Sequence, residues 1–147
     1  MKKVLSAGIA VLMLILCMIP AFADSMTIST GTQQDEWQLT FPADTQIPWE
    51  TAEQALGAVT ATKMLLSPGK TVTVSVESAN GYRLVNTEDA EKSIAYTLSG
   101  ADTIAFFPGD YGKSFPLSAS VAESEWYKAA AGAHTDVLTF TAEYKDA

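Results

Sequence analysis

His134 is the only histidine in the sequence, and it stands two residues before Asp136. An imidazole beside a carboxylate could act as a general base if the fold brought a serine to it, but no serine lies in a nucleophile-elbow sequence. A zinc ion would need at least two further ligands from scattered carboxylates. The pair is more typical of a solvated turn, so the sequence predicts no catalytic residue, no cofactor and no metal site.

The 17 acidic residues leave a second chemistry open. Two carboxylates held close together could hydrolyse a glycosidic bond, but no pair stands out by its spacing. We therefore interpret the protein as not being an enzyme. A hydrolase would be indicated only if two carboxylates, or His134 and an acid, lined one pocket.

The acidic loop of residues 86–91 offers carboxylates at Glu88, Asp89 and Glu91 beside the amide oxygen of Asn86. Calcium prefers oxygen ligands of this kind, but the loop lacks the alternating ligand spacing and the glycine of a calcium-binding loop. A solvated loop is the main interpretation, and calcium binding is the alternative.

Exposed aromatic rings could bind a glycan by stacking. Trp37, Trp49, Tyr111 and Tyr127 are candidates for such a surface. Trp37 is in phase with other apolar residues of one predicted strand, which favours the core, whereas Tyr127 follows Trp126 and is expected to point away from the core. The candidate ligand platform is therefore Tyr127, Tyr111 and Trp49.

The first 23 residues have the composition of a secretory signal peptide. Lys2 and Lys3 precede an apolar run, and Ala21-Phe22-Ala23 gives the small-x-small pattern of a cleavage site. Cys17, the only cysteine, lies inside this leader, so no disulfide is expected in residues 24–147. The sequence thus predicts a secreted, extracellular or cell-surface protein.

The composition of residues 24–147 is strongly acidic. Without Lys2 and Lys3, 7 basic residues stand against all 17 acidic ones, a net charge of about −10. Such a charge disfavours nucleic acid and anionic lipid as partners. After residue 23 no apolar run has the length of a membrane span.

Short alternating segments separated by turn signals indicate an all-β fold. We predict an Ig-like antiparallel β-sandwich of about 7–9 strands with one short helix before the last strand. The extended segments are expected at residues 37–41, 45–49, 58–66, 71–78, 82–85, 93–98, 103–107, 114–121 and 138–144.

Three local predictions concern the connections. Residues 50–57 favour a loop or one helical turn, and Lys63 is expected on the same side of its strand as Val59 and Ala61. Asn80-Gly81 predicts a tight hairpin because both residues accept a positive φ.

The helix is expected over residues 123–131, with Ser124 as its N-cap, Gly132 as its stop, and Trp126 covering one end of the sandwich. Residues 24–35 are expected to form an N-terminal arm or an edge strand, and residues 36–147 the sandwich domain. Met26 and Ile28 alternate with polar residues in the arm, as in a strand with one apolar face.

The C-terminal stretch WYKAAAGAHTDVLTFT, residues 126–141, resembles the ending of the spore coat protein U and usher-type pilin families. There a tryptophan and small residues precede a Gly-x-Tyr/His-x-Asp-x-Leu-x-Phe strand. The resemblance implies an Ig-like sandwich of a secreted surface protein that assembles by donor-strand exchange, in which the arm of one subunit fills a groove of the next. The usual cysteine pair of these families is absent from this sequence.

The function expected from these features is structural or adhesive, as a pilin-like or coat-like assembly subunit at the cell surface. Its partners would be further copies of itself or other surface proteins, with Met26 and Ile28 in the assembly arm. The alternative is a monomeric module that binds a glycan or another surface ligand.

Overall fold

The computed structural model describes residues 26–147, so the predicted signal peptide lies outside the described residues. Residues 34–147 form one compact unit, which we call the body. Residues 26–35 contain no helix or strand. The elements of the body are β1 (Glu36–Thr40), β2 (Glu53–Leu65), β3 (Lys70–Ser78), β4 (Arg83–Asn86), β5 (Ser93–Ala95), β6 (Thr97–Ser99), β7 (Ile104–Phe106), β8 (Ser114–Ser120), α2 (Glu123–Lys128), β9 (His134–Thr135) and β10 (Leu138–Asp146).

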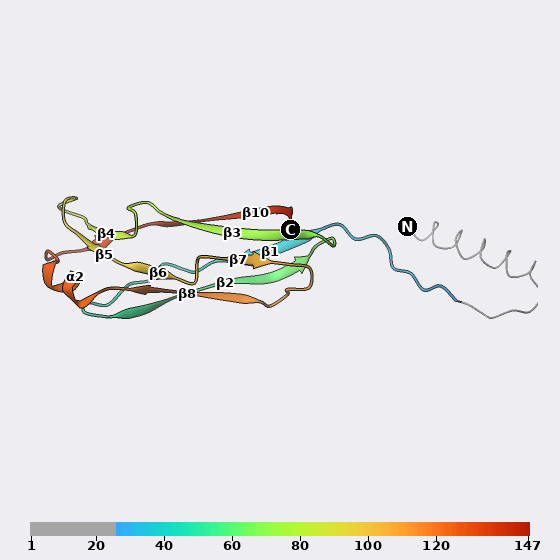
Figure 1. Ribbon diagram of the computed structural model, residues 1–147, viewed down its shortest axis with the longest axis horizontal. Coiled ribbons are helices and arrows are strands. Elements are labelled where there is room, and N and C mark those ends of the chain that lie inside the picture. Colours follow the sequence, from blue (N-terminus) through green and yellow to red (C-terminus); the bar gives the residue numbers. More distant parts are fainter. Residues whose placement is uncertain (1–25) are drawn as a thin grey trace, which may run out of the picture. The chain divides into compact units, whose positions relative to one another are not determined.

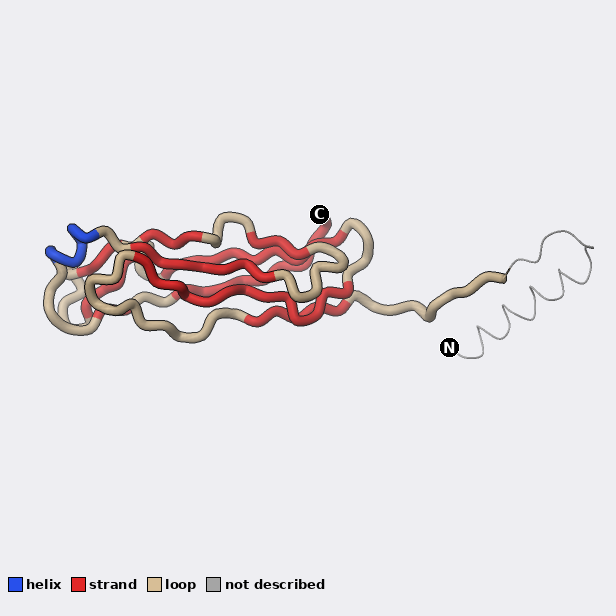
Figure 2. Tube along the Cα trace, turned by 90° about the horizontal axis from the view of Figure 1, so that it is seen from below, coloured by secondary structure: helices blue, strands red, loops and turns tan. Residues whose placement is uncertain are grey.

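The strands form three antiparallel sheets with the orders β1-β2-β8-β6, β10-β3-β7 and β5-β4-β9. Figure 1 shows α2 with β4 and β5 at one end of the body and the C-terminal end of β10 at the other. Figure 2, a view from a second side, shows that the strands run along the length of the body. Within residues 26–147 the prediction of an all-β sandwich with one short helix is confirmed, although the two-residue strand β9 lies between this helix and the last strand. These residues form ten strands, whereas nine segments were predicted. Tyr96 divides the predicted strand 93–98 into β5 and β6, β9 is added, and the predicted segment 45–49 contains no strand.

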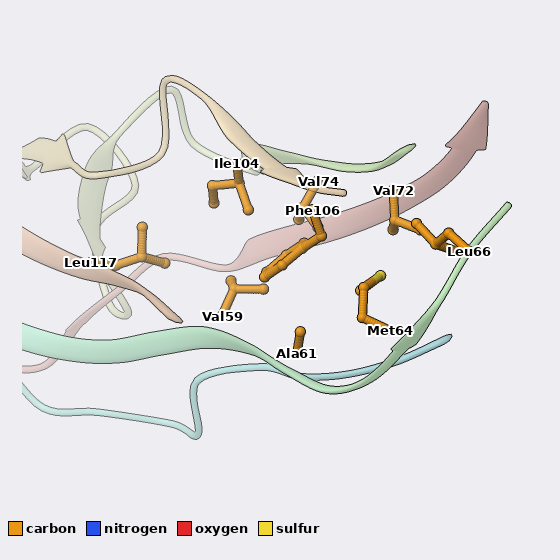
Figure 3. Close-up of a cluster of buried hydrophobic side chains, with 9 residues drawn as sticks. All are labelled: Val59, Ala61, Met64, Leu66, Val72, Val74, Ile104, Phe106 and Leu117. Carbon is orange, nitrogen blue, oxygen red and sulfur yellow. The ribbon is translucent and has the colours of Figure 1, made fainter. Parts of the chain in front are cut away.

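The main core lies between the four-stranded sheet and the β10-β3-β7 sheet. Alternate side chains of β2, β3, β7 and β8 point toward one another in Figure 3, with the fully buried ring of Phe106 among them. This is the period of two expected for strands with one buried face. The buried members are Val59, Ala61, Met64, Leu66, Val72, Val74, Ile104, Phe106 and Leu117.

A second cluster of buried side chains fills the end of the body at α2. It contains Trp126, which is 5% exposed and donates its indole N–H to the Thr51 carbonyl over 3.0 Å. The predicted role of Trp126 in covering one end of the sandwich is therefore confirmed. The other buried members are Ile94, Tyr96, Ala119 and Val121.

β2 begins earlier than predicted, because residues 53–57 are strand and not a loop or a helical turn. Its first residue, Glu53, lies opposite Ser120 of β8, and the register shifts between Ala55 and Gly57. Gly57 has a φ of +103°, which suits a bulge and which residues with a side chain rarely adopt. Pairing with β8 thus outweighs the helix-favouring composition of this stretch.

A second irregularity in β2 corrects the prediction for Lys63. Ala61 is buried, but Lys63 is exposed and Met64 is buried in its place. Lys63 and Ala61 face consecutive residues of β1, so Thr62 is an extra residue on β2. Such an insertion moves every later side chain to the opposite face of the strand.

The predicted Asn80-Gly81 hairpin is wrong. β3 pairs with β10 and β7, whereas β4 pairs with β5 and β9, so the chain passes from one sheet to another at this turn. The chain does turn here, but the positive φ values of 63° and 61° belong to Gly81 and Tyr82, not to Asn80 and Gly81 as predicted. The dipeptide predicted the local turn but not the partner of the strand that follows it.

The ends of α2 also differ from the prediction. Its N-cap is Ala122 instead of Ser124, without a side-chain hydrogen bond, and it ends at Lys128 instead of Ala131. Gly132 has a φ of +108° but follows an extended cap, so it bends the chain toward β9 without ending the helix. Residues 45–49, predicted as an extended segment, contain no strand.

Candidate functional site

One side of the body carries two sheet edges without a partner strand. Within residues 26–147, β10 pairs with β3 alone, and β1 pairs with β2 alone. Two contacts join the β1 edge to the β10 edge. The Phe41 ring lies 5.5 Å from the Phe140 ring, and the Tyr144 hydroxyl donates a hydrogen bond to Asp35. β1 ends at Thr40, and from there the first half of β2 has β8 as its one ladder partner.

Beyond these contacts, residues of all three sheets line a groove, which we call the open seam. Its walls are residues 42–49 and residues 134–140, and it consists of two adjoining cavities of about 660 Å³ and about 430 Å³. Both cavities are lined by Thr45, Leu56, Thr135, Asp136 and Leu138, which makes them one continuous groove. The apolar lining of the two cavities further includes Leu84, Ile94, Leu117, Ala119 and Trp126.

Asp136 is the centre of a hydrogen-bond cluster in the wall of the open seam. Its Oδ2 accepts hydrogen bonds of 2.6 Å from the hydroxyls of Ser78 and Tyr96, and its Oδ1 accepts from the backbone N–H groups of Asn80 and Val137. Burial acts to raise the pKa of Asp136, but these donors outweigh it and hold the pKa below its ordinary value. The cluster joins the β3–β4 turn to the start of β10.

The same cluster acts on Tyr96. Burial first, and then donation to the Asp136 carboxylate, raise the pKa of the Tyr96 hydroxyl well above its ordinary value. The Tyr82 ring meets the Tyr96 ring edge-to-face at 5.9 Å between centroids. Tyr96 is therefore held as a neutral hydrogen-bond donor in the floor of the seam.

His134 is not the loop residue that the sequence predicts, because it begins β9 and pairs with Asn86 of β4. Its Nδ1 lies 3.1 Å from the Gly132 carbonyl oxygen, and its Nε2 lies 3.4 Å from the Asn86 amide nitrogen. This geometry makes Nδ1 the donor to the carbonyl and Nε2 the acceptor. No hydrogen bond joins His134 to Asp136 in the described part of the chain.

Pairs of titratable groups do line the open seam. His134 and Asp136 line the larger cavity, and Asp44 and Asp136 line the smaller one. Both oxygens of Asp136 and both ring nitrogens of His134 already contact protein groups. The Ser78 hydroxyl donates to Asp136 and accepts from two backbone N–H groups, so it is not placed as a nucleophile.

The acidic loop is organised by Asn86, which is 5% exposed. Its Oδ1 accepts from the backbone N–H groups of Glu88 and Asp89, and its Nδ2 donates to the Ala131 carbonyl. The Asn86 amide oxygen, which the sequence suggested as a calcium ligand, thus stabilises the turn. Among residues 26–147, no group of three or more His, Cys, Asp or Glu residues could hold a metal ion.

Trp49 and Tyr127 of the predicted ligand platform both lie at the α2 end of the body, and Tyr111 lies apart from them. Trp49 is 53% exposed, lines the larger cavity and lies 5.0 Å from the Trp126 ring. Tyr127 is 74% exposed on α2, and its hydroxyl donates to Glu123. Tyr111 is 76% exposed, but its loop is hydrogen-bonded to Ala61, about 25 Å along β2 from the α2 end of the body.

The predicted arm residues are accessible. Met26 is 80% exposed and Ile28 is 81% exposed, in a segment without helix or strand. The eight residues 26–33 would span about 26 Å if extended, similar to the seven residues 134–140 of the seam wall.

Ile47 and Tyr96 also line the larger cavity, although neither was predicted as a site residue. In the sequence Tyr96 is in phase with Ile94 and Leu98, a pattern that indicates a core position and nothing more. Ile47 stands one residue before Pro48, and a proline in an extended segment indicates only a corner or a sheet edge.

Comparison of the chain with protein-family models, with curated proteins and with solved structures gives no match. In residues 26–147 no helix has the length and apolar character needed to cross a membrane.

Proposed function

We propose that the protein is a secreted or surface-associated structural or adhesive β-sandwich protein that assembles through its N-terminal arm. In this proposal the arm of one copy enters the open seam of a second copy and pairs with the free edge of β10. Adding a strand to an exposed sheet edge is a general mode of protein recognition. The resemblance of residues 1–23 to a secretory signal peptide supports the secreted location in this proposal.

The observation that carries the proposal is the unpaired edge of β10 beside an apolar groove. An edge strand presents backbone N–H and C=O groups that can pair with another chain. Here the edge borders a groove with Leu56, Ile94 and Leu117 in its lining. A strand entering the open seam would gain both backbone hydrogen bonds and burial of its apolar face.

The arm supplies a matching segment. Met26 and Ile28 are separated by one polar residue, so they lie on one face of an extended chain. Both are exposed, and their transfer into the seam of a second copy would remove apolar area from water. The segment from Met26 to Gln33 carries no charged side chain, which suits entry into an apolar groove.

The first test is the mass in solution of two chains, residues 24–147 and residues 35–147, by size-exclusion chromatography with light scattering. The proposal expects oligomers or fibres of the longer chain and monomers of the shorter one. Stable monomers of both chains would overturn assembly through the arm.

A matched pair of variants locates the effect on one face of the arm. Ile28→Asp and Thr27→Asp each add one negative charge at neighbouring positions. Only Ile28→Asp should abolish assembly, because residue 28 faces the seam and residue 27 faces away from it. Equal loss in both variants would point to general charge repulsion instead of an apolar face entering the groove.

A second candidate function is a monomeric module that binds a glycan at the mouth of the larger cavity. Trp49 favours it, because its exposed ring lies at this cavity against Trp126. A monomeric chain whose tryptophan fluorescence shifts saturably on adding a glycan would support this function over assembly.

A further inference from the structure

The open seam is covered along one side by a segment of the body itself. Residues 42–47, which we call the strap, follow β1 and line both cavities. Within the described residues, no backbone hydrogen bond joins the strap to β10 or to β2. The strap therefore lies beside the free edges of β10 and β2 without forming backbone hydrogen bonds with either strand.

Side chains hold the strap in place. Ile47 is half-buried and packs against the cluster of buried residues that includes Ile94 and Trp126. At the other end, Pro42 lies over Gly57, where an added Cβ would be 3.3 Å from the Pro42 Cβ. The main contact of the strap with the floor of the seam is thus one aliphatic side chain.

The two boundaries of the strap are firmer. Before it, the Phe41 ring packs against the Phe140 ring in a tilted arrangement. After it, the Thr51 N–H donates to the Pro48 carbonyl, and the Thr51 carbonyl accepts from the indole of Trp126. A segment fixed at both ends and held between them by side chains can leave the groove as one unit.

We infer that the strap is a displaceable cover of the open seam, which must move aside before the arm of a second copy can pair with β10. This inference rests on the proposed function, since the arm is the occupant that replaces the strap. An incoming arm would exchange the contacts of Ile47 for those of Ile28 and would add the backbone hydrogen bonds that the strap does not make. The protein would then assemble slowly from a covered state.

The test uses chains of residues 24–147 that carry Ile28→Asp, so that a fluorescent peptide of residues 24–34 is the only competent arm. In this background, Ile47→Ser should raise the association rate of the peptide by about tenfold or more, because it removes most of the apolar burial that holds the strap. Leu65→Ser is the matched control, since Leu65 is exposed and lies outside the seam. If Ile47→Ser does not fold, Ile47→Val should give a smaller rise.

Two readouts separate the strap from the arm. Hydrogen exchange at the backbone amides of β10 reports whether the peptide occupies the seam. Cleavage by the endoproteinase Asp-N before Asp44, which lies within the strap, reports whether the strap has left the seam. Protection of β10 together with faster cleavage, and a faster rate in the Ile47 variant, is the expected result.

The contrary outcomes are distinct. Protection of β10 with unchanged cleavage before Asp44, or equal rates in the Ile47 and Leu65 variants, would overturn the strap as a cover and leave assembly through the arm intact. Absence of β10 protection in every variant would overturn the proposed function and, with it, the role of the strap.

Discussion

The Tyr96 hydroxyl donates a 2.6 Å hydrogen bond to the Asp136 carboxylate, across 40 residues of sequence. This contact joins the point where β5 passes into β6 to the start of β10. It also sets the position of the seam wall, because Asp136 lines both cavities. Several properties of the protein depend on it.

Removal of the Tyr96 hydroxyl should be costly. We expect Tyr96→Phe to lower the free energy of unfolding by about 1.5–3 kcal/mol, the usual size of a hydrogen bond to a charged group. Urea unfolding followed by tryptophan fluorescence measures this change. Tyr111→Phe is the control, because that side chain is 76% exposed, and it should leave stability unchanged.

A double-mutant cycle isolates the pair. Tyr96→Phe and Asp136→Asn combined should cost less than the two single changes added together, because each alone already breaks the same contact. Strictly additive losses would show that the hydroxyl and the carboxylate contribute independently.

The Asp136 carboxylate should make stability depend on acid. Its pKa is lower in the folded protein than its ordinary value of 3.8, so the folded state favours the charged form. The resulting stability is present above that ordinary value and is lost as the pH falls through it toward the lower folded pKa. The difference in unfolding free energy between the wild type and Asp136→Asn should therefore shrink below about pH 4.

Tyr96 should produce the opposite slope in alkali. Its pKa is raised in the folded protein, so the neutral hydroxyl contributes stability that is complete below its ordinary value of 10.0 and is lost as the pH rises above it. Tyr96→Phe should lack this loss. A variant with the same alkaline slope as the wild type would assign the slope to other tyrosines.

Trp126 should contribute more to stability than Trp49, although the two rings are in contact. Trp126→Ala should cost roughly 3–5 kcal/mol, because the ring is almost fully buried and its N–H is hydrogen-bonded. Trp49→Ala should cost clearly less, since half of that side chain is already in water. Equal losses would mean that the contact between the rings, and not burial, dominates.

Gly100 should not tolerate a side chain. A Cβ at this position would lie 2.1 Å from the Pro116 carbonyl oxygen. Gly109 is a matched control, because its φ of +89° is close to the +91° of Gly100 but nothing lies within 4 Å of its Cβ position. Gly109→Ala should cost roughly 1–2 kcal/mol from the backbone alone, and Gly100→Ala should cost several kcal/mol more in thermal or urea unfolding.

The alternation of apolar and polar residues predicted those strands in which pairing with a neighbouring strand does not override the local sequence preference. β3 and β10 contain the predicted strands 71–78 and 138–144 and extend one and two residues beyond them, and Trp126 is buried as predicted. The stretch from Glu53 to Gly57 was predicted wrongly because its composition favours a helix while pairing with β8 determines its conformation. Local preference cannot identify a partner strand about 60 residues away.

The candidate site was less predictable for a related reason. Met26 and Ile28 could be named because alternation marks them within the arm itself. The open seam could not, since it arises where the ladder of β1 ends, at Thr40. Pro42 indicates the end of a strand but not which strand edges are left without a partner beside it. Asp136 was noted beside His134, but its partners Ser78 and Tyr96 lie 58 and 40 residues away in the sequence.

The pairing of β3 with β10 affects how the protein folds during its synthesis. A chain is synthesised from its N-terminus, and β10 is formed by residues 138–146, opposite residues 70–78 of β3. The edge of β3 that pairs with β10 therefore has no partner until almost the entire chain has been synthesised. Contacts between residues so far apart in the sequence also form slowly. The wall of the open seam therefore forms last. Until it does, the unpaired edge of β3 in a nascent chain can pair with strands of neighbouring chains.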